Sequence, residues 1–199
     1  MARRLLRRPA FAVAGIAALL AAGCAETPPS KDFPPTTFSQ YGPIKLDAAT
    51  VEVVDQYTAS STPPHVELLF PTPPGEAVHS WTTDRLQPAG NQGSVKVVIK
   101  DASVVVTQLP PTPGITGLFT IDQAQRYDGR LDVRVDGHDP AKRFDGYTTV
   151  TVTRSITVAE NISLAGRKRE WQRMVQQMMD VLNAELEQGI KHDLAPMVR

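Results

Sequence analysis

Two neighbouring segments of the chain alternate between apolar and polar residues, and this alternation constrains the fold more than any other feature. The apolar positions are Tyr127, Leu131, Val133 and Val135 in residues 126–136, and Phe144, Val150, Val152, Ile156 and Val158 in residues 143–158. Strands of this kind bury one face and expose the other, as in an antiparallel sheet with one solvated side. The sequence Gly137-His138-Asp139-Pro140 between them is typical of a turn. We therefore predict a β-hairpin.

Two further segments are rich in β-branched residues and predict strands. The first covers residues 44–57 and the second residues 94–108. In the second, the apolar alternation shifts by one position between Ile99 and Ala102. A bulge near Lys100 and Asp101 would keep both halves on the core side. The alternative is a strand that is buried on both faces at its far end.

Two segments have helical periodicity. The shorter starts at Pro74, with Glu76 in its first turn, and its inner face carries Ala77, Val78, Trp81, Arg85 and Leu86. The longer covers residues 164–192 and can be capped by Asn161 or Ser163. Its apolar stripe consists of Trp171, Val175, Met178, Leu182, Leu186 and Ile190. We interpret the stripe and its methionines as core, with an adaptable partner surface as the alternative.

The order of these elements is β-α-β-β-β-α. Two amphipathic helices can cover one face of a four-stranded sheet, and the hairpin makes that sheet mainly antiparallel. The sequence therefore predicts a two-layer α+β domain with a short and a long helix on the same face.

The N-terminal residues have the layout of a secretory signal peptide. Four arginines, Arg3, Arg4, Arg7 and Arg8, precede an apolar run from Ala10 to Ala22. That run is about 13 residues, whereas a spanning helix needs about 20. Cys24 follows Ala22-Gly23 and is the only cysteine, so it has no internal disulfide partner. The site resembles a lipobox, with acylation of Cys24. The alternative is an ordinary cleaved signal and a stray thiol.

This N-terminus defines three regions. We expect a signal peptide at 1–23, an acylated cysteine with a proline-rich tether at 24–43, and one α+β domain at 44–195. An extended tether of this composition reaches roughly 60 Å at ~3.1 Å per residue. Residues 1–23 hold four of the 21 basic residues and none of the 21 acidic ones, so the remaining chain has a net charge of −4. A mildly acidic chain does not favour nucleic acid as a partner.

The sequence contains no motif that specifies a reaction. It has no nucleophile elbow, no phosphate-binding glycine loop and no paired-histidine metal motif. The four histidines, His65, His79, His138 and His192, fall in different predicted elements. His79 and Asp84 are five residues apart, which places them on different sides of a helix. We therefore expect no catalytic residue, no metal and no cofactor, and a protein that is not an enzyme.

Two predicted loops carry apolar residues between prolines and glycines. The candidate partner-binding residues in them are Val66, Leu68, Leu69, Phe70, Ile115, Leu118 and Phe119. If both loops lie at one end of the sheet, they form an apolar patch of the kind that binds partners or ligands. The alternative is that these residues pack under the helices as part of the core.

Three features together resemble the bacterial ABC-type transport auxiliary lipoprotein family, to which the lipopolysaccharide-assembly lipoprotein is related in layout. They are Cys24 with its proline-rich tether, the tryptophan-containing segment AVHSWTTDRL at 77–86, and strands followed by the long helix REWQRMVQQMMDVLNAELEQGI at 169–190. The resemblance implies a non-enzymatic, lipid-anchored periplasmic subunit. Such a subunit docks onto envelope transport or assembly proteins. Ala25, rather than Asp, after the acylated cysteine implies the outer membrane.

Three hypotheses remain at this point. The first is an accessory lipoprotein of an envelope transport or assembly complex, with lipids as the transported class. The second is a free-standing lipoprotein that binds lipid or glycan through the loop patch. The third is a periplasmic hydrolase, which would require His79, Ser80 and Asp84 to meet in a concave pocket.

We predict that Cys24→Ser releases the protein from membranes, because the substitution removes the thiol that would carry the lipid. The measurement is fractionation of cells into membrane and soluble extracts, with the unsubstituted protein as control. A Cys24→Ser variant that stays with the membranes would contradict acylation at this position, and an unsubstituted protein that is already soluble would indicate an ordinary cleaved signal.

Overall fold

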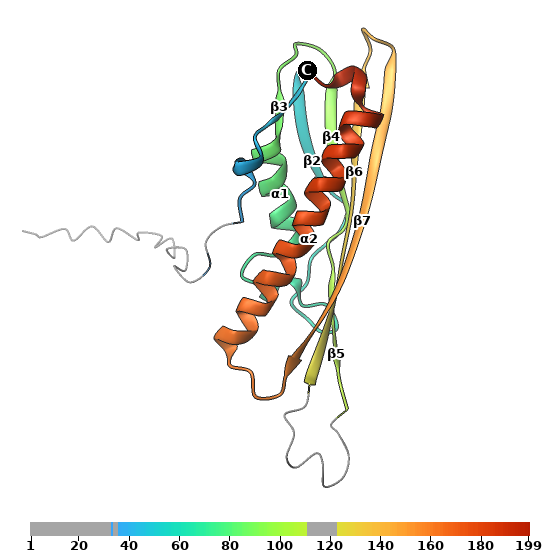
Figure 1. Cartoon of the computed structure of the whole chain (residues 1–199). Coiled ribbons are helices and arrows are strands. Elements are labelled where there is room, and N and C mark those ends of the chain that lie inside the picture. The colour runs from blue at the N-terminus through green and yellow to red at the C-terminus, as the bar shows by residue number, and fades with distance from the viewer. Residues whose placement is uncertain (1–32, 34–35, 111–122) are drawn as a thin grey trace, which may run out of the picture.

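The computed structural model describes residue 33 and residues 36–110 and 123–199. They form a twisted sheet with two helices, α1 and α2, packed on one face, so the predicted two-layer α+β fold is confirmed (Figure 1). The predicted signal peptide and Cys24 lie outside the described residues.

The main sheet contains five strands in four positions. Its strands are β2 (Thr50–Asp55), β4 (Ser94–Asp101), β5 (Val104–Gln108), β6 (Gln123–Asp139) and β7 (Phe144–Ala159). β2 pairs with β4 in parallel, and all other pairs are antiparallel. β7 pairs with β6 along one edge. β4 and β5 pair with the other edge of β6, one after the other along its length. The long strand β6 is therefore the central strand of the sheet.

The predicted bulge in residues 94–108 is confirmed. The pairing of β4 with β6 shifts register between Ile99 and Asp101, and the chain resumes its pairing with β6 at Val104. The Asp101 carboxylate accepts a hydrogen bond from the Ser103 backbone N–H at 2.9 Å. This local turn lets Ile99, Ala102 and Val104 all be buried on the helix side.

Two parts of the sheet differ from the prediction. Residues 44–57 form two strands instead of one: β1 (Ile44–Leu46) pairs in parallel with β3 (Leu86–Pro88), and β2 joins the main sheet. The hairpin turn lies at 140–143 rather than at 137–140. The Asp139 carboxylate accepts hydrogen bonds from the backbone N–H groups of Ala141 and Lys142, which holds the turn beyond the expected position.

The helices begin and end close to the predicted positions. α1 covers Pro74–Arg85, and α2 covers Leu164–Asp193. The Ser163 hydroxyl caps α2 by accepting a hydrogen bond from the Gly166 N–H at 3.0 Å. All six positions of the predicted apolar stripe are buried, together with Met174 and Met179. The methionines of α2 therefore belong to the core and offer no partner surface.

α2 packs most closely on β6 and β7 at two glycines. A Cβ atom on Gly129 of β6 would lie 2.5 Å from the Met174 Cε and 2.9 Å from the Met178 Sδ. A Cβ on Gly189 of α2 would lie 2.2 Å from the Thr148 Oγ1 of β7. The Met174 and Met178 ends that face Gly129 are flexible and can shift, whereas Thr148 is short and branched, so Gly189 is the glycine that the close approach requires.

A polar junction lies between the two helices. The Asn183 Oδ1 of α2 accepts hydrogen bonds from the Trp81 Nε1 and the Arg85 Nε of α1, both at 2.9 Å. Arg85 is 1% exposed. Its guanidinium also pairs with Glu187 and donates to the backbone carbonyls of Tyr41 and Gly42. Arg85 thus joins α1, α2 and the chain that precedes β1.

The chain packs onto the domain from Thr36 onward. Phe38 is fully buried in the core, and Gln172 of α2 donates a hydrogen bond from its Nε2 to the Thr36 Oγ1 at 3.1 Å. The Asp84 carboxylate accepts hydrogen bonds from the Phe38 N–H and the Thr37 hydroxyl. The segment before β1 is thus held at the side of α1 and α2 (Figure 1).

We predict that Arg85→Met lowers the free energy of unfolding by at least about 2 kcal/mol, because it removes the charged donor and leaves buried carbonyls unsatisfied. Urea unfolding at pH 7 measures the change, and limited proteolysis near residues 36–43 reports release of the N-terminal segment. Arg173→Met is the matched control, since Arg173 is 61% exposed and pairs only with Glu170 among the described residues. Equal stability of the two variants would contradict the role given to Arg85.

Candidate functional site

Three aromatic rings from distant parts of the sequence meet beneath the N-terminal half of α2. Phe70 stacks on Trp171 with ring centroids 4.7 Å apart and planes 9° apart. Tyr127 of β6 meets Trp171 edge to face at 5.4 Å and Phe70 edge to face at 6.3 Å. Such pairs add to the stability that burial supplies. The cluster fixes the loop before α1 against the sheet and the helix.

A cavity of about 420 Å³ opens beside this cluster, and we call it the end slot. It lies between the first turns of α2, the paired ends of β5 and β6, and the loop before α1. Its volume is in the range of small-molecule sites. The lining is mainly apolar and consists of Pro63, Pro64, Val66, Leu69, Val106, Gln108, Gln125, Tyr127, Arg167 and Trp171.

Two nitrogen atoms of residues that line the end slot are buried without a hydrogen-bond partner among the described residues. They are the Trp171 Nε1 and the Arg167 Nε. Burial raises the pKa of Tyr127, while the positive charge of Arg167 and the indole N–H of Trp171 oppose that rise. The Tyr127 hydroxyl itself donates a hydrogen bond to the Gln125 Oε1 at 2.7 Å.

Basic residues are concentrated where α2 begins. Arg167, Lys168 and Arg169 follow one another within its first two turns, and no acidic residue lies in the first turn. The N-terminus of a helix carries the positive end of its dipole, so cations are disfavoured there and anions are favoured. The ion pairs of the described residues use other arginines. Three consecutive basic residues therefore add positive charge at the end of α2 where the helix dipole is already positive.

The loop between β2 and α1 is held by a buried carboxylate. Glu67 is fully buried, and its Oε1 accepts hydrogen bonds from the Tyr57 hydroxyl at 2.5 Å and the Ser60 N–H at 2.8 Å. Its Oε2 accepts from the Val104 N–H at 3.1 Å. Burial raises the pKa of Glu67, but these hydrogen bonds outweigh it, and the net pKa lies below the ordinary value. Desolvation and the neighbouring Glu67 charge raise the pKa of the Tyr57 phenol.

The same loop forms one wall of the end slot. The Val66 N–H donates to the Val104 carbonyl at 3.0 Å, and the Val106 N–H donates to the Pro64 carbonyl at 2.8 Å. The loop therefore pairs with the outer edge of β5 for a short stretch. Through Glu67 and these backbone bonds, the wall of the slot is fixed to the sheet.

A second cavity of about 350 Å³ lies between α1 and the end of β2. His79 lines it and contacts the Asp55 carboxylate at 3.1 Å. Ser80 donates its hydroxyl to the Glu76 carbonyl, and Asp84 binds the segment at Thr37 and Phe38. Of His79, Ser80 and Asp84, only His79 lines this cavity, so the three side chains do not meet in this concave pocket as the hydrolase hypothesis requires.

The candidate partner-binding residues have three different outcomes. Val66 and Phe70 are buried at 4% exposure each and belong to the core, which corrects their assignment to an exposed patch. Leu68 and Leu69 are exposed, at 51% and 47%. Ile115, Leu118 and Phe119 lie outside the described residues, as does Cys24. Of the four described residues, only Leu68 and Leu69 remain available to a partner.

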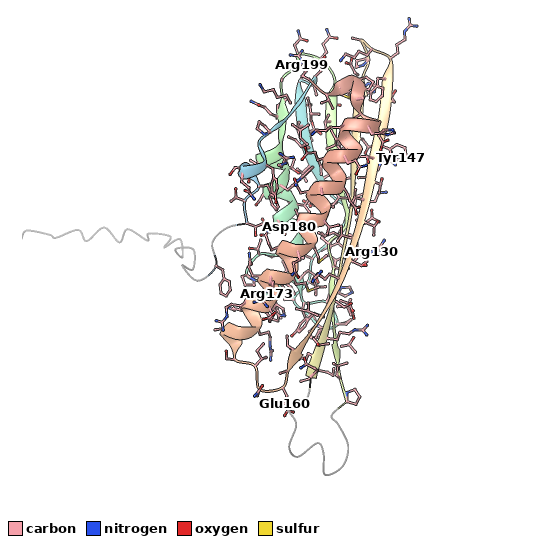
Figure 2. All side chains as sticks on the ribbon, in the orientation of Figure 1. Arg130, Tyr147, Glu160, Arg173, Asp180 and Arg199 are labelled. Carbon is pink, nitrogen blue, oxygen red and sulfur yellow. The ribbon has the colours of Figure 1, made fainter. Side chains whose placement is uncertain are left out.

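The outer face of the sheet carries ion pairs between neighbouring positions of β6. Arg126 pairs with Asp128, Arg130 with Asp132, and Arg134 with Asp136, in each case across the face that points away from the helices. The Arg134 guanidinium also lies 3.8 Å from the centroid of the Tyr147 ring. Figure 2 labels Arg130 and Tyr147 on this side of the molecule. The sheet therefore presents a solvated, charge-paired surface, as its alternation predicts.

Within residues 36–110 and 123–199, no cluster of three or more His, Cys, Asp or Glu side chains has the arrangement of a metal site. No helix in the same part of the chain is long and apolar enough to cross a membrane.

No protein-family profile matches the chain, and no curated protein matches it in sequence. Among solved structures, it is similar to a minor lipoprotein from Acinetobacter baumannii, with 10% identity, a TM-score of 0.38, and coverage of 76% of this chain and 96% of the other. It is also similar to rare lipoprotein B from Shewanella oneidensis, with 14% identity, a TM-score of 0.34 and coverage of 72% and 99%. A third similarity is to PelC from Paraburkholderia phytofirmans, with 11% identity, a TM-score of 0.25 and coverage of 71% and 93%. These values are too low to support a functional conclusion.

Sequence reasoning missed Glu67, Arg167 and Asn183. Glu67 and Asn183 are single polar residues within segments that were assigned from their apolar pattern, so periodicity gives no reason to single them out. Arg167 had one usable signal, because three consecutive basic residues at the start of a helix oppose its dipole. Nothing in the sequence marks Glu67 as the anchor of its loop.

We predict that Glu67→Gln lowers the free energy of unfolding by about 1–3 kcal/mol at pH 7, because an amide cannot accept all of these hydrogen bonds. The folded pKa of Glu67 is depressed, so its contribution is complete above the unfolded value of about 4.3 and is lost as the pH falls through the folded pKa. The two proteins should therefore become closer in stability below about pH 4.

Urea unfolding at pH 7 and at about pH 3.5 measures this difference, the lower value being chosen below the ordinary pKa of a glutamate. Glu160→Gln is the control, because Glu160 is exposed at the far end of β7 (Figure 2). A Glu67→Gln penalty that is the same at both pH values would show that the charge of the carboxylate is not what stabilises the loop.

Proposed function

We propose that the protein is a lipid-anchored periplasmic subunit that assists an envelope transport or assembly complex by docking onto its proteins. The observation that carries this proposal is the N-terminal sequence, in which the layout of a signal peptide ends at Cys24, the single cysteine of the sequence. A proline-rich stretch then separates the proposed acylation site from the folded domain. The lipid class of the transported substrate and the outer-membrane location remain part of the proposal.

The polar contacts and the exposed leucines of the domain support an accessory role. Its most distinctive polar groups are structural: Glu67 holds a loop, and Arg85 with Asn183 joins the helices. The exposed leucines Leu68 and Leu69 lie on a loop that is fixed to the sheet, so they form a rigid surface rather than a mobile one. A rigid surface with exposed apolar side chains is suited to docking. We accordingly propose that the protein has no turnover of its own.

The end slot favours one second candidate function, a free-standing lipoprotein that binds a lipid. Glycans are recognised mainly through hydrogen bonds to their hydroxyl groups, whereas the lining of this cavity is mostly proline, valine, leucine and aromatic rings. The lining therefore supports lipid over glycan as the ligand class of this alternative.

We predict that detergent extraction of the full-length protein from native membranes, followed by affinity capture, recovers transport or assembly subunits in fixed proportion. The captured proteins are identified by mass spectrometry. A Leu68→Asp/Leu69→Asp double variant should lose these partners, since it places charge on the docking surface, while Leu164→Asp at the exposed start of α2 is the matched control. Recovery of the protein alone would contradict the accessory role and favour the free-standing alternative.

A further inference from the structure

The strand β7 is a long, open edge of the main sheet. It pairs with β6 in one unbroken register from Val158 back to Phe144, and no backbone group of residues 145–158 bonds to a described residue outside β6. Figure 1 shows β7 along the outer margin of the sheet, with β6 on its inner side. In an antiparallel pair, every second residue of an edge strand directs its N–H and carbonyl groups away from the neighbouring strand. The outer edge of β7 therefore presents a row of unused donors and acceptors.

The other edges of the sheet are protected. The outer edge of β5 is covered by the loop before α1, where the Val106 N–H donates to the Pro64 carbonyl at 2.8 Å. β2 has only six residues and carries the charges of Glu52 and Asp55. Covering, shortening and charging are the usual means by which natural proteins keep sheet edges from pairing.

β7 lacks these protections. It contains no proline, its only charged residues are Asp145 and Arg154, and its register with β6 has no bulge between Phe144 and Val158. Eleven of its 16 residues are β-branched or aromatic, a composition that favours pairing with another strand. Threonines alternate along its exposed outer face at 149, 151 and 153. An uncovered edge of this kind is a template for a further strand.

The position of α2 determines which strand can fit. α2 covers β7 itself, since Thr148, Val150 and Val152 are each 6% exposed beneath it. A Cβ atom on Gly146 would lie 3.2 Å from the Asp193 carbonyl oxygen of the helix end. Two copies joined through β7 would place these strands about 4.8 Å apart, each with its own α2 above it. Packed helix axes lie about 8–10 Å apart, so the two helices would overlap. A second copy therefore does not fit, whereas a strand without such a helix does.

The side of α2 that faces away from α1 adds an apolar contact. Val181 lies two turns before Gly189, the residue that approaches Thr148 of β7, and Asn183 marks the opposite side, which binds α1. Val181 is 43% exposed. A strand added to β7 would therefore meet an apolar side chain on its helix side and a row of threonines on its outer side.

From these observations we infer that the edge of β7 binds an extended segment of another envelope protein, which adds to the main sheet as a further strand. Main-chain hydrogen bonds to β7 supply the affinity. An alternation of apolar residues on the helix side with threonine, serine or other β-formers on the outer side selects the segment. That the partner is an envelope protein rests on the proposed function, whereas the open edge does not.

The test uses the full-length protein in its native membranes. The photoreactive residue p-benzoylphenylalanine replaces Thr149, Thr151 or Thr153 in turn, and mass spectrometry maps where each crosslinks. We expect adducts to one protein, with attachment points that move in one direction by about two residues for each step along β7. Thr107 is the control position, because it is exposed on β5, where the outer edge is already paired. It should give no such series.

Two neighbouring proline variants test the backbone itself. Thr153 and Arg154 are both exposed, and in an antiparallel strand one of two neighbouring N–H groups binds β6 while the other points to the open edge. Of Thr153→Pro and Arg154→Pro, the variant with the higher melting temperature is therefore the one that lost the outer N–H. That variant should lower the yield of the partner in affinity capture about fivefold or more. Arg154→Thr measures the effect of the charge alone.

The inference would be overturned by an absence of adducts at all three positions, by attachment points without order, or by adducts to β7 of a second copy. An unchanged capture yield in the proline variant with the higher melting temperature would overturn it as well. If affinity capture recovers transport or assembly subunits but no crosslinked series forms at β7, the proposed function stands and this inference fails. If capture recovers no such subunit, both fail.

Discussion

The position of α2 depends on one oxygen atom. The Asn183 Oδ1 accepts hydrogen bonds from Trp81 and Arg85 within a layer that is otherwise apolar. A slide of either helix by one turn would break both bonds and leave a buried guanidinium unsatisfied, which is costly at low dielectric. Apolar stripes alone allow several registers, whereas this junction selects one. The Arg85 guanidinium of this junction also donates hydrogen bonds to the carbonyls of Tyr41 and Gly42. The junction therefore also fixes the position of the segment before β1.

The end slot is a consequence of this placement. With α2 fixed at Asn183 and held close to the sheet at Gly129 and Gly189, its first turns extend beyond α1 and over the paired ends of β5 and β6 (Figure 1). α1 does not fill the space beneath them. The loop before α1 closes one side, held by Glu67, and the aromatic cluster around Trp171 closes the inner end. The cavity therefore remains open at the end of α2 that carries the basic residues.

Sequence patterns predicted the elements well where a single periodicity extends over many residues. The α2 stripe, the alternation of β6 and β7, and the parity shift between Ile99 and Ala102 each report which side of an element is buried. Predictions from these patterns were wrong where a side chain contacts the backbone or a distant segment. Asp139 moves the hairpin turn by binding two N–H groups, and β1 separates from β2 because its partner, β3, follows α1 in the chain.

The sequence by itself determined the two-layer α+β class, both helices and the bulge, because burial of apolar side chains sets the period of each element. It also supplies the whole case for an anchor at Cys24. Only the tertiary structure decided which polar residues matter, since Glu67, Arg85 and Asn183 obtain their roles from partners far away in the chain. It likewise separated the apolar loop residues into buried Val66 and Phe70 and exposed Leu68 and Leu69. A one-dimensional pattern records hydrophobicity, whereas hydrogen-bond partners and cavities exist only once the chain is folded.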